Sequence, residues 1–157
     1  MSIETGKKFI QVREVIRKKS PKFAKWIPNI LLKYLERTIH EDDINDIMYR
    51  FRDLSGLDFV DALIKDLGID VVIEGEENIP LTDSVIFASN HPLGGLDGIA
   101  FMEAIGRYRR DVKFIVNDFL MNIVNLEPLF IGVNKIGGQS KSAISAVDEA
   151  YAGEHAL

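Results

Sequence analysis

The sequence of 157 residues contains no cysteine, five prolines and a single tryptophan. The absence of cysteine excludes a thiol nucleophile, a zinc–thiolate site and a disulfide framework. No run of about 18 apolar residues occurs, so no segment is expected to span a bilayer as a helix. The first residues also lack the apolar stretch and the cleavage site of a secretory signal, which predicts a cytoplasmic protein.

Hydrophobic residues make up 46% of the chain and charged residues 27%, a balance typical of one soluble globular domain. A chain of this length buries roughly 68–70% of the surface that its unfolded form exposes, so we expect it to fold without a metal or a disulfide. The three histidines are far apart, and none belongs to a His-Glu-x-x-His motif. We therefore expect no metal site.

Basic residues are concentrated near the start of the chain. Residues 1–40 hold 10 Lys/Arg and 3 Asp/Glu, whereas residues 41–157 hold 9 and 21, so excesses of +7 and −12 give the net charge of −5. This asymmetry predicts an anionic partner, either nucleic acid or anionic lipid, unless the basic helix face is only solvated. The acidic remainder, in which residues 108–113 are the one small basic cluster, argues against nucleic acid.

Apolar side chains stand beside the basic ones in this first segment. They are Trp26, Ile27, Ile30 and Leu31, next to Lys18, Lys19, Lys22 and Lys25. Each basic residue near an anionic leaflet is worth about 1 kcal/mol of binding free energy. We therefore expect peripheral contact with an anionic membrane surface, on the inner face of the membrane, unless these apolar side chains pack on the core.

The hydrophobic pattern changes near residue 68. Apolar residues recur at helical spacing before it, and Gly68 is a typical residue at a helix end. Four short apolar runs are typical of strands, at 69–75, 84–90, 112–117 and 128–134, with helical spacing at 96–105 and 140–152. This alternation predicts an α/β fold, in which a basic helical lead-in (1–68) precedes a core (69–157) with a mainly parallel sheet and flanking helices. The two regions can pack as one domain.

The run VIFASNHPLGGLDG, residues 85–98, contains the main candidate site. His91 follows an expected strand, and ligands of open α/β sheets bind beyond the carboxyl ends of strands. A histidine, with an ordinary pKa of about 6.5, can act as a base near neutral pH. Asp97 could accept the imidazole N–H and orient the ring. Gly94 and Gly95 let backbone N–H groups approach a ligand at a helix N-terminus, which favours anions.

A purely structural interpretation of the same residues stays open. Asp97 could cap the helix, the two glycines could form only a turn, and His91 could be a hydrogen-bonded loop residue. The sequence contains no Gly-x-Ser-x-Gly motif, which argues against a serine hydrolase.

Asn90-His91 followed by Asp97 resembles the Asn-His-(four residues)-Asp block of the glycerolipid acyltransferases, the lysophosphatidic-acid acyltransferase superfamily. The longer string SNHPLGGLDGIA is similar to a bacterial, hemolysin-like branch that includes the acyltransferases of ornithine and glycine lipids. The pieces HEDDIN, VKFIVNDFLM and EPLFIGVNKIGGQS resemble the same branch. The resemblance covers roughly residues 40–152.

The resemblance implies an acyltransferase that moves a fatty acyl group from an acyl thioester to a lyso-lipid acceptor. The donor is carried by coenzyme A or acyl carrier protein, and neither a further cofactor nor a metal is implied. His91 matches the general base and Asp97 its carboxylate partner. The expected substrate-binding residues are Asn90, Gly94, Gly95, Asn117 and Lys135.

The sequence departs from the family pattern in two places. Five residues, not four, separate His91 from Asp97, and the paired glycines make the extra residue easy to absorb. Lys135 stands near the place where the family usually has an arginine, and lysine lacks the bidentate fork that suits phosphate. A non-phosphate head group would fit this change. Asn117 either lines the cleft or only follows a strand.

The resemblance also leaves alternatives open. A non-catalytic module that binds lipid or a membrane surface could keep the same fold, and the same base could serve a hydrolase. The Phe-Pro-Glu-Gly-like turn that the family carries after its second block is not in the sequence. We therefore expect a C-terminally truncated chain with an incomplete sheet, inactive alone, or an oligomer that covers the open sheet edge.

Overall fold

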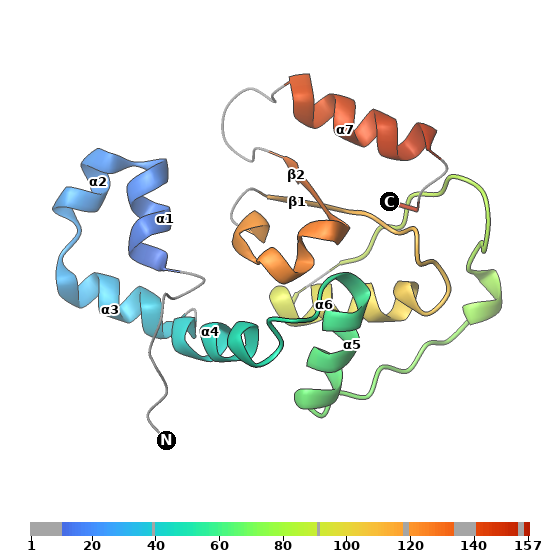
Figure 1. Cartoon of the computed structure of the whole chain (residues 1–157), viewed down its shortest axis with the longest axis horizontal. Coiled ribbons are helices and arrows are strands. Elements are labelled where there is room, and N and C mark those ends of the chain that lie inside the picture. The colour runs from blue at the N-terminus through green and yellow to red at the C-terminus, as the bar shows by residue number, and fades with distance from the viewer. Residues whose placement is uncertain (1–10, 39, 91, 118–119, 134–140, 154–155) are drawn as a thin grey trace. The chain divides into compact units, whose positions relative to one another are not determined.

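The computed structural model describes residues 11–38, 40–90, 92–117, 120–133, 141–153 and 156–157 (Figure 1). The chain consists of two compact units, Met1–Arg52 and Asp53–Leu157.

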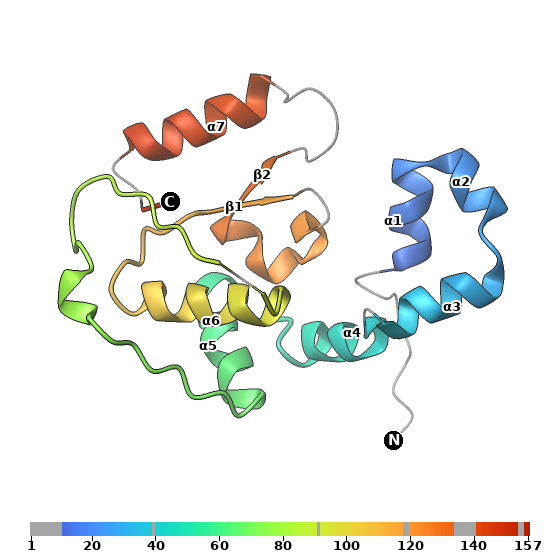
Figure 2. The same cartoon turned by 180° about the vertical axis from the view of Figure 1, so that it is seen from behind.

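The described part of the first unit is helical (Figure 2). Its helices are α1 (Val12–Lys19), α2 (Pro21–Trp26), α3 (Asn29–Thr38) and α4 (Glu41–Arg50). Helix α1 contacts both α2 and α3, and α3 contacts α4. The guanidinium of Arg13 donates to Asn29 Oδ1 at 2.9 Å, which joins α1 to the start of α3. Pro21 begins α2, a first-turn position in which its missing N–H costs no helical hydrogen bond.

The second unit combines helices with a small parallel sheet. It contains α5 (Gly56–Asp66), α6 (Gly95–Gly106), β1 (Phe114–Asn117), β2 (Phe130–Val133) and α7 (Lys141–Ala152), with short 3-10 helices η1 (Glu76–Asn78), η2 (Leu120–Asn122) and η3 (Val124–Leu129). Strands β1 and β2 pair in parallel, with Phe114 opposite Phe130. This confirms the predicted α/β fold with an incomplete parallel sheet. The helices expected at 96–105 and 140–152 are α6 and α7.

The core of the second unit lies where these elements meet. Helix α5 contacts α6 and η3, and α7 contacts β2. Gly106 lies so close to α5 that an added Cβ would stand 2.6 Å from Leu57 Cδ2, so the absence of a side chain permits this approach. The buried apolar residues of the unit include Phe59, Val60, Met102, Val112, Leu126 and Ile131. Helix α5, which falls in the expected lead-in, thus packs within the second unit.

Two expected strands are not formed as predicted. Residues 69–75 run between α5 and η1 without β pairing, and Val72 is 78% exposed. Residues 84–90 make a single parallel bridge, between Val85 and Ala156. A β-branched run becomes a strand only where a neighbouring backbone completes a ladder, and these two runs have little or none.

The last two residues supply the backbone partners that the 84–90 segment does have. The Phe87 N–H donates to Leu157 O at 2.6 Å, and the Leu157 N–H donates to Val85 O at 2.9 Å. The Lys113 N–H in turn donates to Ala156 O at 2.7 Å. The 84–90 segment is thereby linked, through residues 156–157, to the segment that enters β1. In both views the 84–90 segment and β1 run toward the side on which α6 begins (Figures 1 and 2).

Within the described ranges, no helix combines the length and the apolar character that crossing a bilayer requires.

Candidate functional site

The candidate site lies where the 84–90 segment turns into α6. Gly94 occupies the N-cap position of this helix with φ 68° and ψ −119°, a backbone conformation that residues with a Cβ rarely adopt. Its carbonyl accepts a hydrogen bond from the Gly98 N–H at 3.2 Å, the first bond of the helix. Gly95 is the first residue of α6. Residues 92–94 thus form a turn that leads directly into α6. We call residues 90–97 the site turn.

Asp97 closes the site turn from inside the first turn of α6. Its Oδ2 accepts a hydrogen bond from the Leu93 N–H at 2.6 Å. This bond ties the residue before the N-cap to the first turn of the helix, and the charge of the carboxylate suits the helix N-terminus. Asp97 therefore has a local structural role, although the N-cap position that the structural interpretation gave it belongs to Gly94.

Asn90, at the start of the site turn, is exposed, and its carbonyl accepts a hydrogen bond from Ser89 Oγ at 2.8 Å. His91 of the site turn lies outside the described residues, and so does Lys135, which is farther along the chain. The pairing of His91 with Asp97 therefore stays a prediction.

Asn117 ends β1 and is partly buried. Its Oδ1 accepts a hydrogen bond from the Leu120 N–H at 3.3 Å, which links the end of β1 to the first residue of η2. This contact gives Asn117 a structural role, and a role in lining a substrate cleft stays a prediction.

Sequence reasoning did not find the role of Arg109, a side chain with five hydrogen bonds in the second unit. The guanidinium of Arg109 is 3% exposed and donates to the carbonyl oxygens of Pro80, Thr82 and Asp83, each at 3.0 Å. It also donates to both carboxylate oxygens of Asp111, at 2.8 and 2.6 Å. We call these five residues the Arg109 clamp.

The Arg109 clamp shifts the ionisation of Asp111 and fixes a strained residue. The hydrogen bond from Arg109 lowers the pKa of the Asp111 carboxyl to about 2. Asp83, whose carbonyl the guanidinium holds, has φ 68°, in the left-handed region that non-glycine residues rarely enter. The clamp therefore fixes the loop just before the 84–90 segment. The only sequence signal was the spacing of Arg109 and Asp111 inside a basic cluster, and it did not reveal the carbonyl partners.

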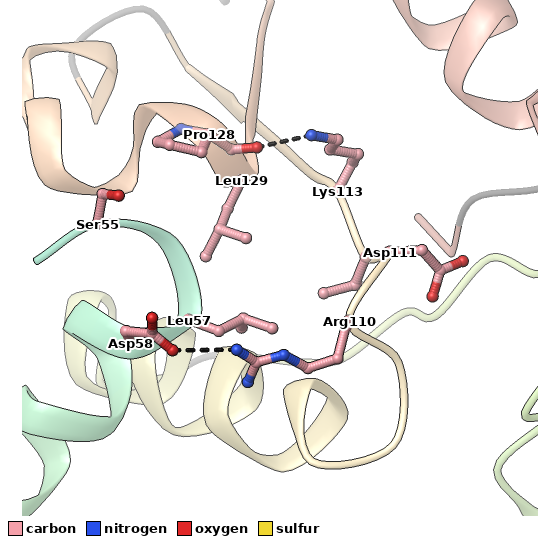
Figure 3. Close-up of a pocket in the computed structure, with 9 residues that line it drawn as sticks. Ser55, Leu57, Asp58, Arg110, Asp111, Lys113, Pro128 and Leu129 are labelled. Atoms are coloured by element: carbon pink, nitrogen blue, oxygen red, sulfur yellow. Dashed lines mark hydrogen bonds and ion pairs between the residues drawn. The ribbon is translucent and has the colours of Figure 1, made fainter.

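The remaining charges of this basic cluster also have protein partners. Arg110 forms an ion pair with Asp58 at 3.0 Å, and the Lys113 ammonium donates to the Pro128 carbonyl at 2.7 Å (Figure 3). These residues line a cavity of about 310 Å³, together with Ser55, Leu57, Asp111, Val112 and Leu129. None of the predicted site residues that the structure describes lines it. Its charged groups contact protein atoms.

A grouping of three His, Asp or Glu side chains that could hold a metal ion is not found within the described part of the chain. The expectation of a reaction without a metal stays a prediction. The candidate site is thus a helix N-terminus, a conformationally special glycine and a fixed carboxylate.

Comparison with known proteins identifies the family. Residues 14–157 match the family described as acyltransferase. Lyso-glycine lipid O-acyltransferase from Bacteroides thetaiotaomicron is 40% identical over 143 residues, which cover 90% of this chain and 53% of that protein. The protein of the same name from Phocaeicola vulgatus is 36% identical over 147 residues, 93% of this chain and 53% of that protein.

The chain spans about half the length of these curated relatives. No solved structure shows significant similarity. The family match extends well beyond the site turn and covers both units, so the resemblance seen in the sequence is confirmed. The chain belongs to the acyltransferase family.

Proposed function

We propose that the protein transfers a fatty acyl group from an acyl thioester to the hydroxyl of a lyso-lipid with an amino-acid head group. The observation that carries the proposal is the family match over residues 14–157, which includes the site turn at the N-terminus of α6. Two relatives are named lyso-glycine lipid O-acyltransferase, which supports both the lipid acceptor and the oxygen nucleophile.

In the proposed reaction His91 acts as the general base. It removes the proton of the acceptor hydroxyl while the oxygen attacks the carbonyl carbon of the thioester. The new C–O bond forms and the C–S bond breaks, and the proton passes from the imidazolium to the departing thiolate of coenzyme A or acyl carrier protein. A histidine suits both steps, because its ordinary pKa of about 6.5 lies near the working pH.

In the same proposal Asp97 orients the imidazole. The carboxylate of Asp97 is fixed by a hydrogen bond from the Leu93 N–H. Leu93 is only two residues after His91 in the chain. A carboxylate held by a backbone hydrogen bond needs no rearrangement before it receives the imidazole N–H, and such preorganisation is what an orienting group requires. Gly94 adopts a positive φ, which allows the turn to accommodate five residues, not four, between His91 and Asp97.

The residues proposed for substrate binding suit an acceptor with one carboxylate. The backbone N–H groups at Gly94 and Gly95 stand at a helix N-terminus, where negative charge is favoured. Lys135 would add a point charge, which a carboxylate accepts as readily as a phosphate does. Asn90 and Asn117 would contribute polar groups at the carboxyl ends of two extended segments.

The test is acyl transfer by the complete product of the gene, supplied with acyl thioesters and with lyso-lipids that carry either amino-acid or phosphate head groups. His91→Ala should lower turnover by about 10²–10⁴-fold, the usual contribution of a positioned base. Gly98→Ala is the control, because this helical residue has open space around its Cα and no proposed role. Near-full turnover by His91→Ala would contradict the proposal, and acyl release to water without acceptor would indicate a hydrolase.

A further inference from the structure

Several large apolar side chains of the first unit are exposed. Trp26 is 88% exposed, Ile30 81% and Tyr34 65%. Ile30 and Tyr34 stand four residues apart in α3, so their side chains lie on the same face of this helix. Trp26 ends α2, and the other two belong to α3. An exposed apolar patch of this kind marks an interaction surface more often than a solvated one.

The opposite side of α3 is the side that the fold buries. Leu32 is 2% exposed and points about half a turn away from Ile30 and Tyr34. Among the described side chains of α3, Leu32 is therefore committed to the interior, and Ile30 and Tyr34 form a separate apolar face at the surface. Packing on the core explains Leu32, and it does not explain Trp26 or Ile30.

Basic residues flank this exposed apolar face. Lys33 and Arg37 lie three residues after Ile30 and Tyr34, on the same side of α3, and both are exposed. Lys25, also exposed, precedes Trp26. The one acidic residue of α3, Glu36, lies on the side of Leu32. The exposed face is therefore apolar at its centre and cationic at its margin.

We propose that the α3 face formed by Ile30, Lys33, Tyr34 and Arg37 docks, together with Trp26 at the end of α2, on the surface of an anionic phospholipid bilayer. Aliphatic side chains enter the boundary between head groups and acyl chains, tryptophan and tyrosine rings lie at the head groups, and basic side chains contact lipid phosphates. All three kinds of side chain are present on this one face. A second copy of the chain fits less well, because Lys33 and Arg37 of the two copies would repel each other.

The proposal goes beyond the proposed acyl transfer and does not depend on it. The docking residues belong to the first unit, whereas the site turn belongs to the second. A failure of the docking proposal appears as loss of vesicle binding, whereas a failure of the proposed reaction appears as loss of acyl transfer. The two failures can therefore be told apart.

Trp26 is the only tryptophan of the chain and therefore reports directly on docking. With the full chain and vesicles that contain phosphatidylglycerol, its emission should shift to shorter wavelength and the chain should co-sediment. Vesicles of pure phosphatidylcholine should give a much weaker effect, and added salt should weaken the effect on anionic vesicles because it screens surface charge.

Two double variants test the two components of the face. Lys33→Glu with Arg37→Glu should weaken binding to anionic vesicles by about tenfold or more. Ile30→Ser with Tyr34→Ser should reduce the shift of Trp26 emission. Lys65→Glu is the matched charge control, because Lys65 is an exposed residue near the end of α5 in the second unit. Circular dichroism checks that each variant keeps its helices.

Three outcomes would overturn the proposal. Equal binding to neutral and anionic vesicles would remove the charge argument. Unchanged binding by both double variants would remove this face as the docking surface. A salt-sensitive dimer that the α3 variants abolish, in a chain that binds no vesicles, would show that a second copy covers the face.

Discussion

The segments before and after residues 84–90 differ in the burial and the hydrogen bonding of their polar groups. Before the segment, the buried guanidinium of Arg109 contacts three backbone carbonyls and both oxygens of Asp111. After the segment, the site turn exposes most of its residues and is closed by the bond between Asp97 and the Leu93 N–H.

This difference suggests different roles, in which the Arg109 clamp stabilises the fold and the exposed site turn is accessible to a ligand. A buried cation is tolerated only when its donors are satisfied by well-placed acceptors, so the Arg109 clamp is committed to structure. A helix N-terminus that remains at the surface keeps its affinity for an anion. The comparison predicts that changes in the clamp reduce stability and that changes in the site turn reduce activity.

The largest effect on stability is expected from Arg109→Met. This change leaves the Asp111 carboxylate and three loop carbonyls without the guanidinium. Because Asp111 is 35% exposed, the pair is only partly buried, and each hydrogen bond to a charged group contributes about 1.5–3 kcal/mol. Arg110→Met is the neighbouring control, because the exposed ion pair between Arg110 and Asp58 is worth at most about 1 kcal/mol. Urea unfolding of both variants measures the difference. Equal free energies of unfolding would show that the clamp does not hold the fold.

A smaller effect is expected from Gly94→Ala. Alanine at φ 68° and ψ −119° is strained although no atom lies within 4 Å of the added Cβ, and such strain costs about 1–3 kcal/mol. Gly98→Ala also meets no neighbouring atom, and because Gly98 is helical it should raise stability by up to about 1 kcal/mol. Thermal unfolding compares the two variants. If Gly94→Ala melts at the same temperature as Gly98→Ala, the site turn does not require this conformation.

The smallest effect is expected in acid. The carboxyl of Asp111 has a pKa of about 2 in the folded chain, below its ordinary value of 3.8, because Arg109 donates to it. Between these values the unfolded chain binds more protons than the folded chain. The contribution of Asp111 to stability is therefore complete above about pH 4 and disappears as the pH falls through about 2. Urea unfolding as a function of pH measures it.

The matched control for the acid effect is Asp111→Asn, which has no carboxyl to titrate. Its stability should change less than that of the wild-type chain between about pH 4 and 2. Identical pH profiles would mean that the pKa of Asp111 is not lowered by folding.

Local sequence patterns predicted the helices of the second unit well. Apolar residues at 96–105 and 140–152 have helical spacing, and α6 and α7 form there, because an amphipathic helix makes its own backbone hydrogen bonds. The runs at 112–117 and 128–134 became β1 and β2 because each finds the other as a partner. Residues 69–75 have the same composition and find no such partner.

The candidate site was predictable only in part. The Asn-His block marked the site turn, and the N-terminus of α6 lies where the glycines predicted it. The bond from the Leu93 N–H to Asp97 follows from the geometry of the turn, which spacing alone does not give. The Arg109 clamp depends on carbonyl groups at residues 80–83, almost 30 positions away, and carbonyl groups carry no sequence signal.

Asp97→Asn tests most directly the proposal that the site turn carries the chemistry. Asparagine can still accept the Leu93 N–H through its Oδ1, so the turn should persist and the melting temperature should stay close to that of the wild-type protein. Acyl transfer to a lyso-lipid by the complete gene product should nevertheless fall about 10²-fold or more, because the amide cannot orient and stabilise the imidazolium of His91. Wild-type turnover by Asp97→Asn, with loss only in Asp97→Ala, would show that Asp97 merely closes the turn and would contradict the proposed mechanism.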